Sequence, residues 1–327
     1  MKILVIGAGS IGRRHIGNLN SLGYEDIDVA DLSEECIKYV RANYKVGDCF
    51  RESEKAISSK HYDAAFILTP PAHHIGIACK LAEKGTDLFI EKPLSDSLDG
   101  IDLLVKTKEE KKIVAMVGYN QRFNQGIRKL KEYIESGSLG KIYYIRAEVG
   151  QYLPDWRPWQ DYRRSYTARK ELGGGIILDA SHEIDYVLWL AKSKVTAVKS
   201  LYGRLSDLEI DVEDLAETIM GFENKVIGSV HLNMLERGYN RYCRIVGEKG
   251  SVKWTFKEGL MEYYDGAADK KWSEILVLDP NQSYLDELRH FFSCVEKREE
   301  PVTNLYTAKE TLVTVMRIKG GKECQPQ

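Results

Sequence analysis

The sequence predicts an α/β fold with two domains: a doubly wound parallel sheet, then an α/β domain with a second, mostly antiparallel sheet. Short apolar runs alternate with helical patterns up to about residue 120, which is typical of parallel strands covered by helices. The first of these runs leads directly into the glycine-rich segment 7–12. After residue 140, strand-like runs follow one another with turns between them. The 327 residues are enough for two domains.

The first predicted domain extends over residues 1–121. Ligands of doubly wound sheets bind beyond the carboxyl ends of the strands. Three such ends should therefore face the binding crevice, at Thr69-Pro70, at Glu91-Lys92-Pro93 and at 119–123. The expected strands are 2–7, 27–31, 63–68, 87–91 and 113–118, and the expected helices are about 11–22, 33–43, 72–84 and 97–110.

Three glycines between the first strand and the first helix form a G-x-G-x-x-G motif. Gly7 suits a tight turn, Gly9 lets the backbone approach a pyrophosphate, and Gly12 lets the helix pack close to the strand. The phosphates would lie beside Ser10 and Ile11, at the helix N-terminus, where free N–H groups favour negative charge. The motif therefore predicts a dinucleotide site, while a cluster of glycines in an ordinary turn is the alternative.

An acidic residue, Asp31, ends the second apolar run. It lies close to the position about twenty residues after the glycine motif at which a carboxylate binds the ribose hydroxyls of a dinucleotide. Because it would repel a 2′-phosphate, we predict NAD as the cofactor and NADP as the less favoured one. Arg13 and Arg14 leave some room for the phosphorylated cofactor, and a strand-end Asp in a turn is the alternative interpretation.

Composition excludes several classes of protein. The net charge of −2 argues against a general nucleic-acid or membrane-surface protein, because those carry a basic excess. No apolar stretch approaches the length of a membrane span, and the N-terminus enters a strand without a signal-peptide pattern, so we expect a cytoplasmic protein. The six cysteines lack metal-ligand spacing and are expected to be reduced thiols, so no metal is predicted.

The second predicted domain covers residues 122–327. It opens with a helix at about 124–136 and closes with helices at about 283–298 and 307–319. The strands expected between them are 142–149 and runs near 195–203, 215–222, 225–234, 241–247 and 251–256.

The residues after Gly173-Gly174-Gly175 predict one amphipathic helix. Their spacing sets Asp179, His182 and Asp185 on one face of that helix. A histidine beside carboxylates suits a general base that takes a proton from an alcohol. A capping or core histidine satisfied by its neighbours is the alternative.

Taken together, the glycine motif, Thr69-Pro70, Glu91-Lys92-Pro93 and the segment from Gly173 to His182 resemble the glucose-fructose oxidoreductase / inositol dehydrogenase / rhizopine-catabolism (Gfo/Idh/MocA) family of NAD(P)-dependent sugar oxidoreductases. The resemblance implies an N-terminal Rossmann domain. It also implies a C-terminal α/β domain whose large open sheet commonly forms the interface of a homodimer or homotetramer.

The resemblance further implies the roles of individual residues. Lys92 would hydrogen-bond the reacting sugar oxygen, and His182 would accept the hydroxyl proton while hydride leaves for the nicotinamide. Asp179 would hold a substrate hydroxyl or tune His182, although the pair is three residues apart here and usually four apart in the family. Cofactor contacts are implied for the glycine loop and Asp31 and for Thr69, Pro70, His73, Glu91, Lys92 and Arg122.

The segment 151–170 is rich in aromatic residues and arginines, and we expect a loop with a short helix. Aromatic faces stack on sugar rings or bases, and arginine binds phosphate or carboxylate bidentately. The segment therefore predicts an anionic substrate, a nucleotide sugar or a sugar acid; an interface between subunits is the alternative. The candidate substrate residues are Tyr119, Trp159, Tyr162, Arg163, Arg164 and Tyr166.

The predicted function is an NAD-dependent oxidoreductase acting on a secondary hydroxyl of a sugar derivative, with resemblance to a branch associated with bacterial surface sugars. A second possibility is a glycosidase that uses NAD transiently, through oxidation, elimination and return of the hydride. A third is a non-catalytic dinucleotide-sensing regulator. Lys92 and His182 disfavour the regulator, because a binding module needs neither a base nor an electrophile.

Overall fold

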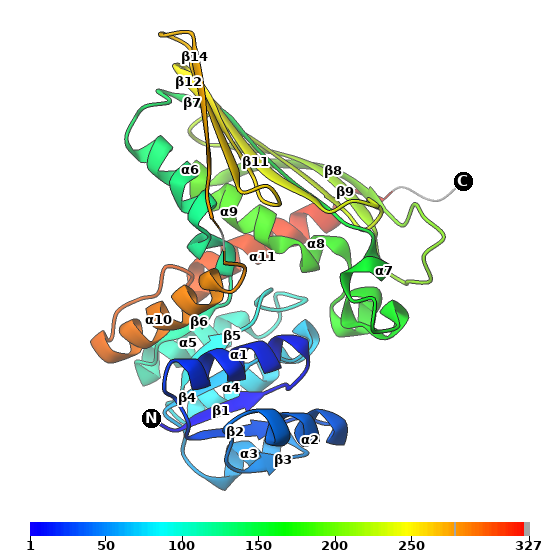
Figure 1. Ribbon diagram of the computed structural model, residues 1–327. Coiled ribbons are helices and arrows are strands. Elements are labelled where there is room, and N and C mark those ends of the chain that lie inside the picture. Colours follow the sequence, from blue (N-terminus) through cyan, green and yellow to red (C-terminus); the bar gives the residue numbers. More distant parts are fainter. Residues whose placement is uncertain (278, 324–327) are drawn as a thin grey trace. The chain divides into compact units, whose positions relative to one another are not determined.

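Contacts divide the computed structural model, which describes residues 1–277 and 279–323, into two units (Figure 1). Unit 1 comprises Met1–Tyr119 and Tyr284–Glu310, and unit 2 comprises Asn120–Ser283 and the chain from Thr311 on. The chain first passes from unit 1 to unit 2 between Tyr119 and Asn120, close to the predicted boundary at 121. The sequence prediction placed 284–310 in the second domain, whereas its aromatic and charged side chains pack in unit 1: Phe291 contacts Phe66 and Phe89, and Arg298 binds Asp87.

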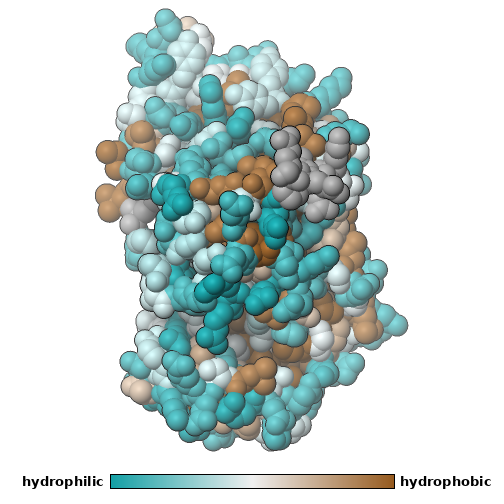
Figure 2. All heavy atoms as spheres, turned by 90° about the vertical axis from the view of Figure 1, so that its right-hand side faces the viewer, coloured by the Kyte–Doolittle hydropathy of each residue, from teal (hydrophilic) through white to brown (hydrophobic). Residues whose placement is uncertain are grey.

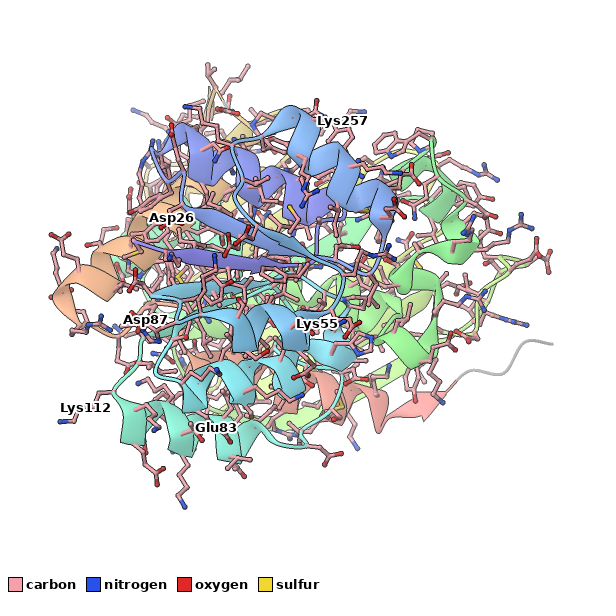
Figure 3. The ribbon with its side chains drawn as sticks, turned by 90° about the horizontal axis from the view of Figure 1, so that it is seen from below. Asp26, Lys55, Glu83, Asp87, Lys112 and Lys257 are labelled. Carbon is pink, nitrogen blue, oxygen red and sulfur yellow. The ribbon has the colours of Figure 1, made fainter. Side chains whose placement is uncertain are left out.

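Unit 1 is a six-stranded parallel sheet in the order β3-β2-β1-β4-β5-β6, with helices on both faces (Figures 1 and 3). This is the doubly wound order of a Rossmann domain, as predicted. Strands β1, β4 and β5 are apolar along almost their whole length because both faces are covered. The strands are β1 Ile3–Ile6, β2 Ile27–Ala30, β3 Cys49–Phe50, β4 Ala64–Ile67, β5 Asp87–Ile90 and β6 Ala115–Val117. The helices are α1 Ser10–Ser21, α2 Glu34–Asn43, α3 Ser53–Ser59, η1 Pro71–His73, α4 His74–Glu83, α5 Ile101–Lys111 and most of α10 Gln282–Lys297.

Unit 2 is built on a nine-stranded sheet in the order β14-β13-β12-β11-β7-β10-β9-β8-β15, counted over the described residues. All neighbouring pairs are antiparallel except β7 with β10 and β8 with β15, which confirms the mostly antiparallel sheet. The strands are β7 Ile142–Gly150, β8 Val195–Gly203, β9 Leu215–Phe222, β10 Ile227–Asn233, β11 Asn240–Gly247, β12 Gly250–Thr255, β13 Leu260–Asp265, β14 Lys270–Ile275 and β15 Lys322–Glu323. The helices are η2 Asn120–Phe123, α6 Gln125–Glu135, α7 Leu153–Trp156, η3 Tyr162–Arg164, η4 Tyr166–Ala168, η5 Lys170–Leu172, α8 Ile176–Asp179, α9 Ser181–Ala191 and the end of α11 Leu305–Lys319.

One face of the unit 2 sheet is apolar and carries helices. Ile145 and Ala147 of β7 and Ile245 of β11 are buried there. Gly126 of α6 lies directly on the ring of Trp254, since a Cβ at this position would come within 2.1 Å of the ring. The residues that alternate with this face, Arg146 and Glu148 of β7 among them, are half-exposed and polar.

No helix in the described part of the chain is long and apolar enough to cross a membrane. Hydrophilic and hydrophobic side chains are interspersed on the face drawn in Figure 2. Five cysteines, Cys36, Cys49, Cys79, Cys243 and Cys294, have free thiols, as predicted, and Cys324 lies outside the described residues. Within 1–277 and 279–323, no three His, Cys, Asp or Glu side chains form a group that could hold a metal ion.

Candidate functional site

The glycine loop between β1 and α1 has the geometry that its motif predicts. Gly7 has a φ of +102°, and a Cβ there would lie 2.5 Å from the carbonyl oxygen of Leu68, so only glycine fits. A Cβ at Gly12 would lie 2.1 Å from the carbonyl oxygen of Gly7, which explains the close packing of α1 on the loop. A Cβ at Gly9, by contrast, would have no heavy atom within 4 Å apart from those of its chain neighbours. Gly9 is followed by α1, whose N-terminus makes no hydrogen bond to a capping side chain. This open helix N-terminus fits a pyrophosphate.

The carboxylate of Asp31 lies against the same loop. It accepts hydrogen bonds from the Ala8 N–H at 2.6 Å and from the Ser33 N–H at 2.7 Å, so it fixes the loop relative to α2. The Arg13 guanidinium lies over the ring of Tyr39, at 3.8 Å from its centroid, and also donates to the carbonyl of Ala8. The two arginines that left room for NADP are thus both packed on tyrosines, since Arg14 lies over Tyr284.

The segment after β4 presents a second polar group that fits a cofactor. Thr69 Oγ1 is buried and has no hydrogen-bond partner among the described residues. Pro70 is half-exposed and His73 is exposed. Gly9, Ser10, Asp31 and Thr69 are therefore the residues of unit 1 best placed to hold a dinucleotide.

Lys92 follows β5 and is half-exposed, and buried polar side chains hold its backbone. Glu91, only 6% exposed, accepts the N–H of Lys92 on Oε2 at 2.8 Å. Its Oε1 lies 3.2 Å from Nε2 of the buried His15. The structure thus gives Glu91, a predicted cofactor residue, two partners inside the protein, and both fix the start of the Glu-Lys-Pro segment.

Sequence reasoning missed two residues of α10 that lie beside this segment. Burial raises the pKa of the Tyr284 phenol, and the charges of Arg14, Glu91, Glu287 and Lys92 also act on it. Glu287 is fully buried, and burial, together with the nearby Glu91, raises the pKa of its carboxyl well above the ordinary value. Because α10 is far from Glu91 in the sequence, no local sequence pattern indicates that its side chains lie beside the Glu-Lys-Pro segment. His15 was detectable, because it follows Gly12 by one helical turn on the buried face.

In unit 2 the predicted single helix after the glycines is wrong. Helix α8 ends at Asp179, Ala180 departs from helical geometry with a ψ of 27°, and α9 begins at Ser181. The rule for residues on one helix face therefore does not relate Asp179 to His182. The half-buried His182 stands in the first turn of α9, two residues beyond the break at Ala180.

The Asp179 carboxylate is held by the arginine-rich segment. The Tyr166 hydroxyl donates to its Oδ1, and the Thr167 hydroxyl donates to Oδ2 at 3.3 Å. Asp179 is buried, so these contacts fix the residue that precedes the α8–α9 break.

Asp185, expected on the same face as His182, serves a different purpose. It is 1% exposed and binds the guanidinium of Arg122 through two hydrogen bonds of 2.7 Å, from Nε and from Nη2. Thr311 of α11 donates to the same carboxylate at 3.1 Å. The predicted cofactor residue Arg122, 5% exposed, is thus part of a buried ion pair that joins η2, α9 and α11.

The glycines before α8 permit close packing. A Cβ at Gly174 would lie 2.3 Å from the carbonyl oxygen of Tyr166, and one at Gly175, whose φ is +104°, would lie 2.3 Å from Glu213 Oε1. Glu213 in turn accepts the N–H of Ile177 at 3.3 Å and so caps α8. The glycines let the arginine-rich segment and Glu213 approach the helix that ends at Asp179.

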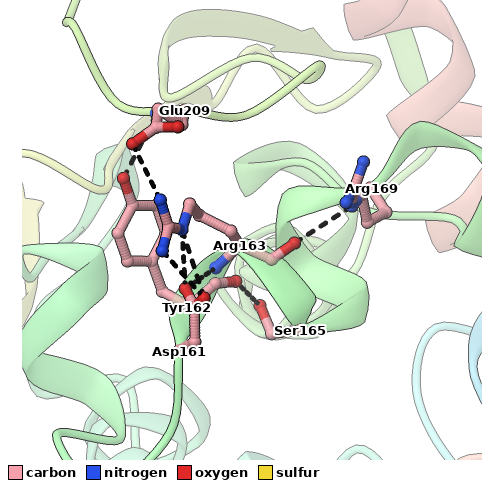
Figure 4. A network of polar contacts seen from close by, with 6 residues as sticks. All are labelled: Asp161, Tyr162, Arg163, Ser165, Arg169 and Glu209. Atoms are coloured by element: carbon pink, nitrogen blue, oxygen red, sulfur yellow. Dashed lines mark hydrogen bonds and ion pairs between the residues drawn. The ribbon is translucent and has the colours of Figure 1, made fainter.

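Part of the predicted substrate segment is used in local contacts (Figure 4). Arg163 pairs with Asp161 at 2.9 Å and with Glu209 at 3.1 Å, and the Tyr162 hydroxyl accepts the Glu209 N–H at 3.2 Å. Arg164 is exposed, and Trp159 is 78% exposed. Tyr119, the other predicted substrate residue, is buried in unit 1 just after β6.

Comparison with known families decides the class of protein. Residues 1–119 match the model of the oxidoreductase family with an NAD-binding Rossmann fold, and residues 127–253 match the GFO/IDH/MocA C-terminal domain. The chain belongs to the Gfo/Idh/MocA family. Its first unit is an NAD-binding Rossmann domain, and the protein is an oxidoreductase. Relatives of the chain are named inositol and levoglucosan dehydrogenases.

Individual members of the Gfo/Idh/MocA family agree with this assignment. The chain is 27% identical to the myo-inositol 2-dehydrogenase of Thermotoga maritima, over 96% of this chain and 93% of that protein. Levoglucosan dehydrogenase in complex with NADH and levoglucosan has a TM-score of 0.87 at 20% identity, over 98% of this chain and 96% of that one. The WlbA dehydrogenase of Bordetella pertussis in complex with NADH and UDP-GlcNAcA has a TM-score of 0.80 at 22% identity, over 97% and 95%. The two structures show the shared fold.

Proposed function

We propose that the protein is an NAD-dependent dehydrogenase acting on a secondary hydroxyl of an anionic or nucleotide-linked sugar derivative. One observation carries the choice of substrate: the arginine-rich segment is anchored to Asp179 through Tyr166 and Thr167. The segment that bears the exposed Arg164 and Trp159 is therefore bound to Asp179, which precedes the α8–α9 break and lies three residues before His182 in the sequence.

Each proposed role follows from the chemistry of the side chain. NAD, when bound, supplies the hydride acceptor. An imidazole nitrogen of His182 accepts the hydroxyl proton, because histidine is the side chain that most often acts as a general base in enzymes. The Lys92 ammonium donates a hydrogen bond to the reacting oxygen and stabilises the negative charge that develops there. Asp179 holds a substrate hydroxyl or orients His182.

The contacts of the arginines support one of them over the other as the residue that recognises an anion. Arg163 is neutralised by Asp161 and Glu209, so a substrate would have to compete with two carboxylates. We therefore assign anion recognition to Arg164. The names of the relatives support a sugar-derived substrate: one is a myo-inositol dehydrogenase, and one neighbour in structure is described with UDP-GlcNAcA.

We also propose that the open face of the unit 2 sheet joins copies of the chain in a homodimer or homotetramer. Leu201, Ile219 and Ile227 are large apolar side chains about half-exposed on this face. Replacing Ile219 with Glu should dissociate the assembly in analytical ultracentrifugation, and an unchanged sedimentation coefficient would contradict the proposal. The cytoplasmic location stays a prediction from the sequence.

The first experiment follows the absorbance of reduced nicotinamide with NAD and a panel of UDP-sugars, CMP-sugars, free sugars and inositols. We expect a signal with an anionic sugar. Arg164→Gln should raise the KM for that sugar about tenfold and leave the KM for a neutral sugar unchanged, because one charge-assisted bond is lost. Arg289→Gln, on the exposed side of α10, is the matched control. Silence across the panel with NAD retained would contradict the dehydrogenase and favour the NAD-recycling glycosidase or the regulator.

The proposed catalytic roles have their own test. Lys92→Ala and His182→Ala should each lower kcat about 100- to 10,000-fold, as expected for loss of an electrophile or a general base. The Kd for NAD, measured by fluorescence titration, should change little. A Lys92→Ala protein with full activity would contradict the proposed mechanism.

A further inference from the structure

A fully buried histidine, His74, connects the ends of two neighbouring strands of unit 1. It is the first residue of α4, directly after η1, and its side chain is 0% exposed. Nε2 lies 2.7 Å from the carbonyl oxygen of Thr69, beyond the end of β4. Nδ1 lies 2.9 Å from the carbonyl oxygen of Pro93, beyond the end of β5.

The position of Pro93 makes the second contact informative. Pro93 follows Lys92 directly. The backbone N–H of Lys92 itself donates a hydrogen bond to the Glu91 carboxylate. Buried side chains thus hold the backbone both before and after Lys92. The lysine side chain itself reaches a half-exposed position. An ammonium group that must meet a reacting oxygen within a few tenths of an ångström requires such a rigid base.

We propose that His74 is a positioning residue for Lys92, and that it acts through a hydrogen bond from Nδ1–H to the carbonyl oxygen of Pro93. The inference rests on the proposed role of Lys92. It assigns to His74 no contact with substrate or cofactor.

The protonation chemistry of the ring makes the proposal specific. Burial lowers the pKa of His74, so the ring is neutral at neutral pH. A neutral imidazole carries one N–H and therefore donates to one of the two carbonyl oxygens. If the proton is on Nδ1, Lys92 is held; if it is on Nε2, only the turn at Thr69 is held.

Two isosteric amides separate these cases. The amide nitrogen of Asn lies close to the position of Nδ1 in histidine, and that of Gln lies close to the position of Nε2. His74→Asn should therefore keep the bond to Pro93, and its kcat should stay within about threefold of the wild type. His74→Gln should lose that bond and at least about tenfold in kcat, since a misplacement near 1 Å costs up to about 100-fold. His74→Phe, which keeps only the ring, should fall at least as far.

His61→Gln is the matched control, because His61 is an exposed histidine of the same unit. It should retain wild-type kcat. Circular dichroism checks that each variant is folded. A kcat for the Asn variant less than about threefold above that of the Gln variant, or a Phe variant at wild-type kcat, overturns the proposal.

Two further measurements do not depend on catalysis. The ¹⁵N chemical shifts of His74 in the unmodified protein distinguish a proton on Nδ1, which we expect, from one on Nε2, which overturns the proposal even if no variant folds. Trace acetylation of Lys92 without substrate should proceed at the wild-type rate in the Asn variant and at an altered rate in the Gln variant. If Lys92→Ala retained full activity, the proposed function would fail while these two measurements would still report whether His74 positions the lysine.

Discussion

Removal of the Asp185 carboxylate is expected to destabilise unit 2 strongly. Asp185→Ala takes two 2.7 Å hydrogen bonds from the guanidinium of Arg122 and a third of 3.1 Å from Thr311. Arg122 is 5% exposed, so water cannot readily replace the lost carboxylate. Breaking a buried pair by removing one partner costs about 3–5 kcal/mol in free energy of unfolding. An exposed pair contributes only about 0–1 kcal/mol.

Urea unfolding followed by circular dichroism measures this cost. Glu110→Ala, which removes the exposed Lys106–Glu110 pair, is the control and should change the unfolding free energy by less than about 0.5 kcal/mol. Replacing both Arg122 and Asp185 with Leu should recover most of the loss, because no buried charge then remains. A loss below about 1 kcal/mol for Asp185→Ala would refute this reasoning, since it would mean that the guanidinium is solvated where it lies.

Three further predictions concern unit 1 and the sheet of unit 2. Asp31→Ala should weaken NAD binding about ten- to 100-fold in fluorescence titrations and reduce discrimination against NADP, because the carboxylate that we expect to bind the ribose hydroxyls is lost; unchanged affinity for both would exclude Asp31 from the site. Gly126→Ala places a Cβ 2.1 Å from Trp254 and should lower the urea unfolding free energy by about 1–3 kcal/mol. Gly76→Ala, with open space around the new Cβ, should raise it by about 0.5–1 kcal/mol. Glu287→Gln tests a buried acid whose pKa is raised in the folded state by burial and then by Glu91. The stability that this acid contributes is present below its unfolded pKa and lost as the pH rises toward its raised folded pKa, so the Gln variant should gain stability relative to the wild type as the pH increases above the ordinary range of a glutamate. A difference in stability that is independent of pH would contradict the raised pKa.

The sequence predicted those parts of the fold in which each element carries its own signal. The buried runs of β1, β4 and β5 are apolar along their length, and the glycine motif fixed the first strand–turn–helix unit. The short elements β3 and α3 were missed because two residues of strand and seven of helix leave too little periodicity. Strand β14, which was also missed, has the polar sequence KKWSEI, and it is an edge strand whose side chains are mostly exposed.

The candidate site was predicted less completely, because its polar residues depend on tertiary contacts. Lys92, Asp179 and His182 were chosen as candidates from short motifs, and their roles stay predictions. The partner of Asp179 was not, since the contact with Tyr166 requires the turn that Gly174 and Gly175 permit. His73 was selected as a cofactor residue, whereas the structure buries the adjacent His74 between two carbonyl groups. The sequence alone does not distinguish two adjacent histidines. Which of them faces inward depends on the residue at which α4 begins, and that residue is His74.

The return of the chain to unit 1 explains why the boundary of the matched NAD-binding domain is not the boundary of a folding unit. The match ends at residue 119, but the Val117 N–H of β6 donates a backbone hydrogen bond to the carbonyl oxygen of Thr303. Phe291 covers the rings of Phe66 and Phe89, and Arg298 neutralises the buried Asp87. A chain ending at residue 119 would expose this aromatic surface and leave a buried carboxylate without its cation, and each of these costs free energy. The same return brings Tyr284 and Glu287 beside Glu91, so the setting of Lys92 is complete only after α10 has folded onto the Rossmann sheet.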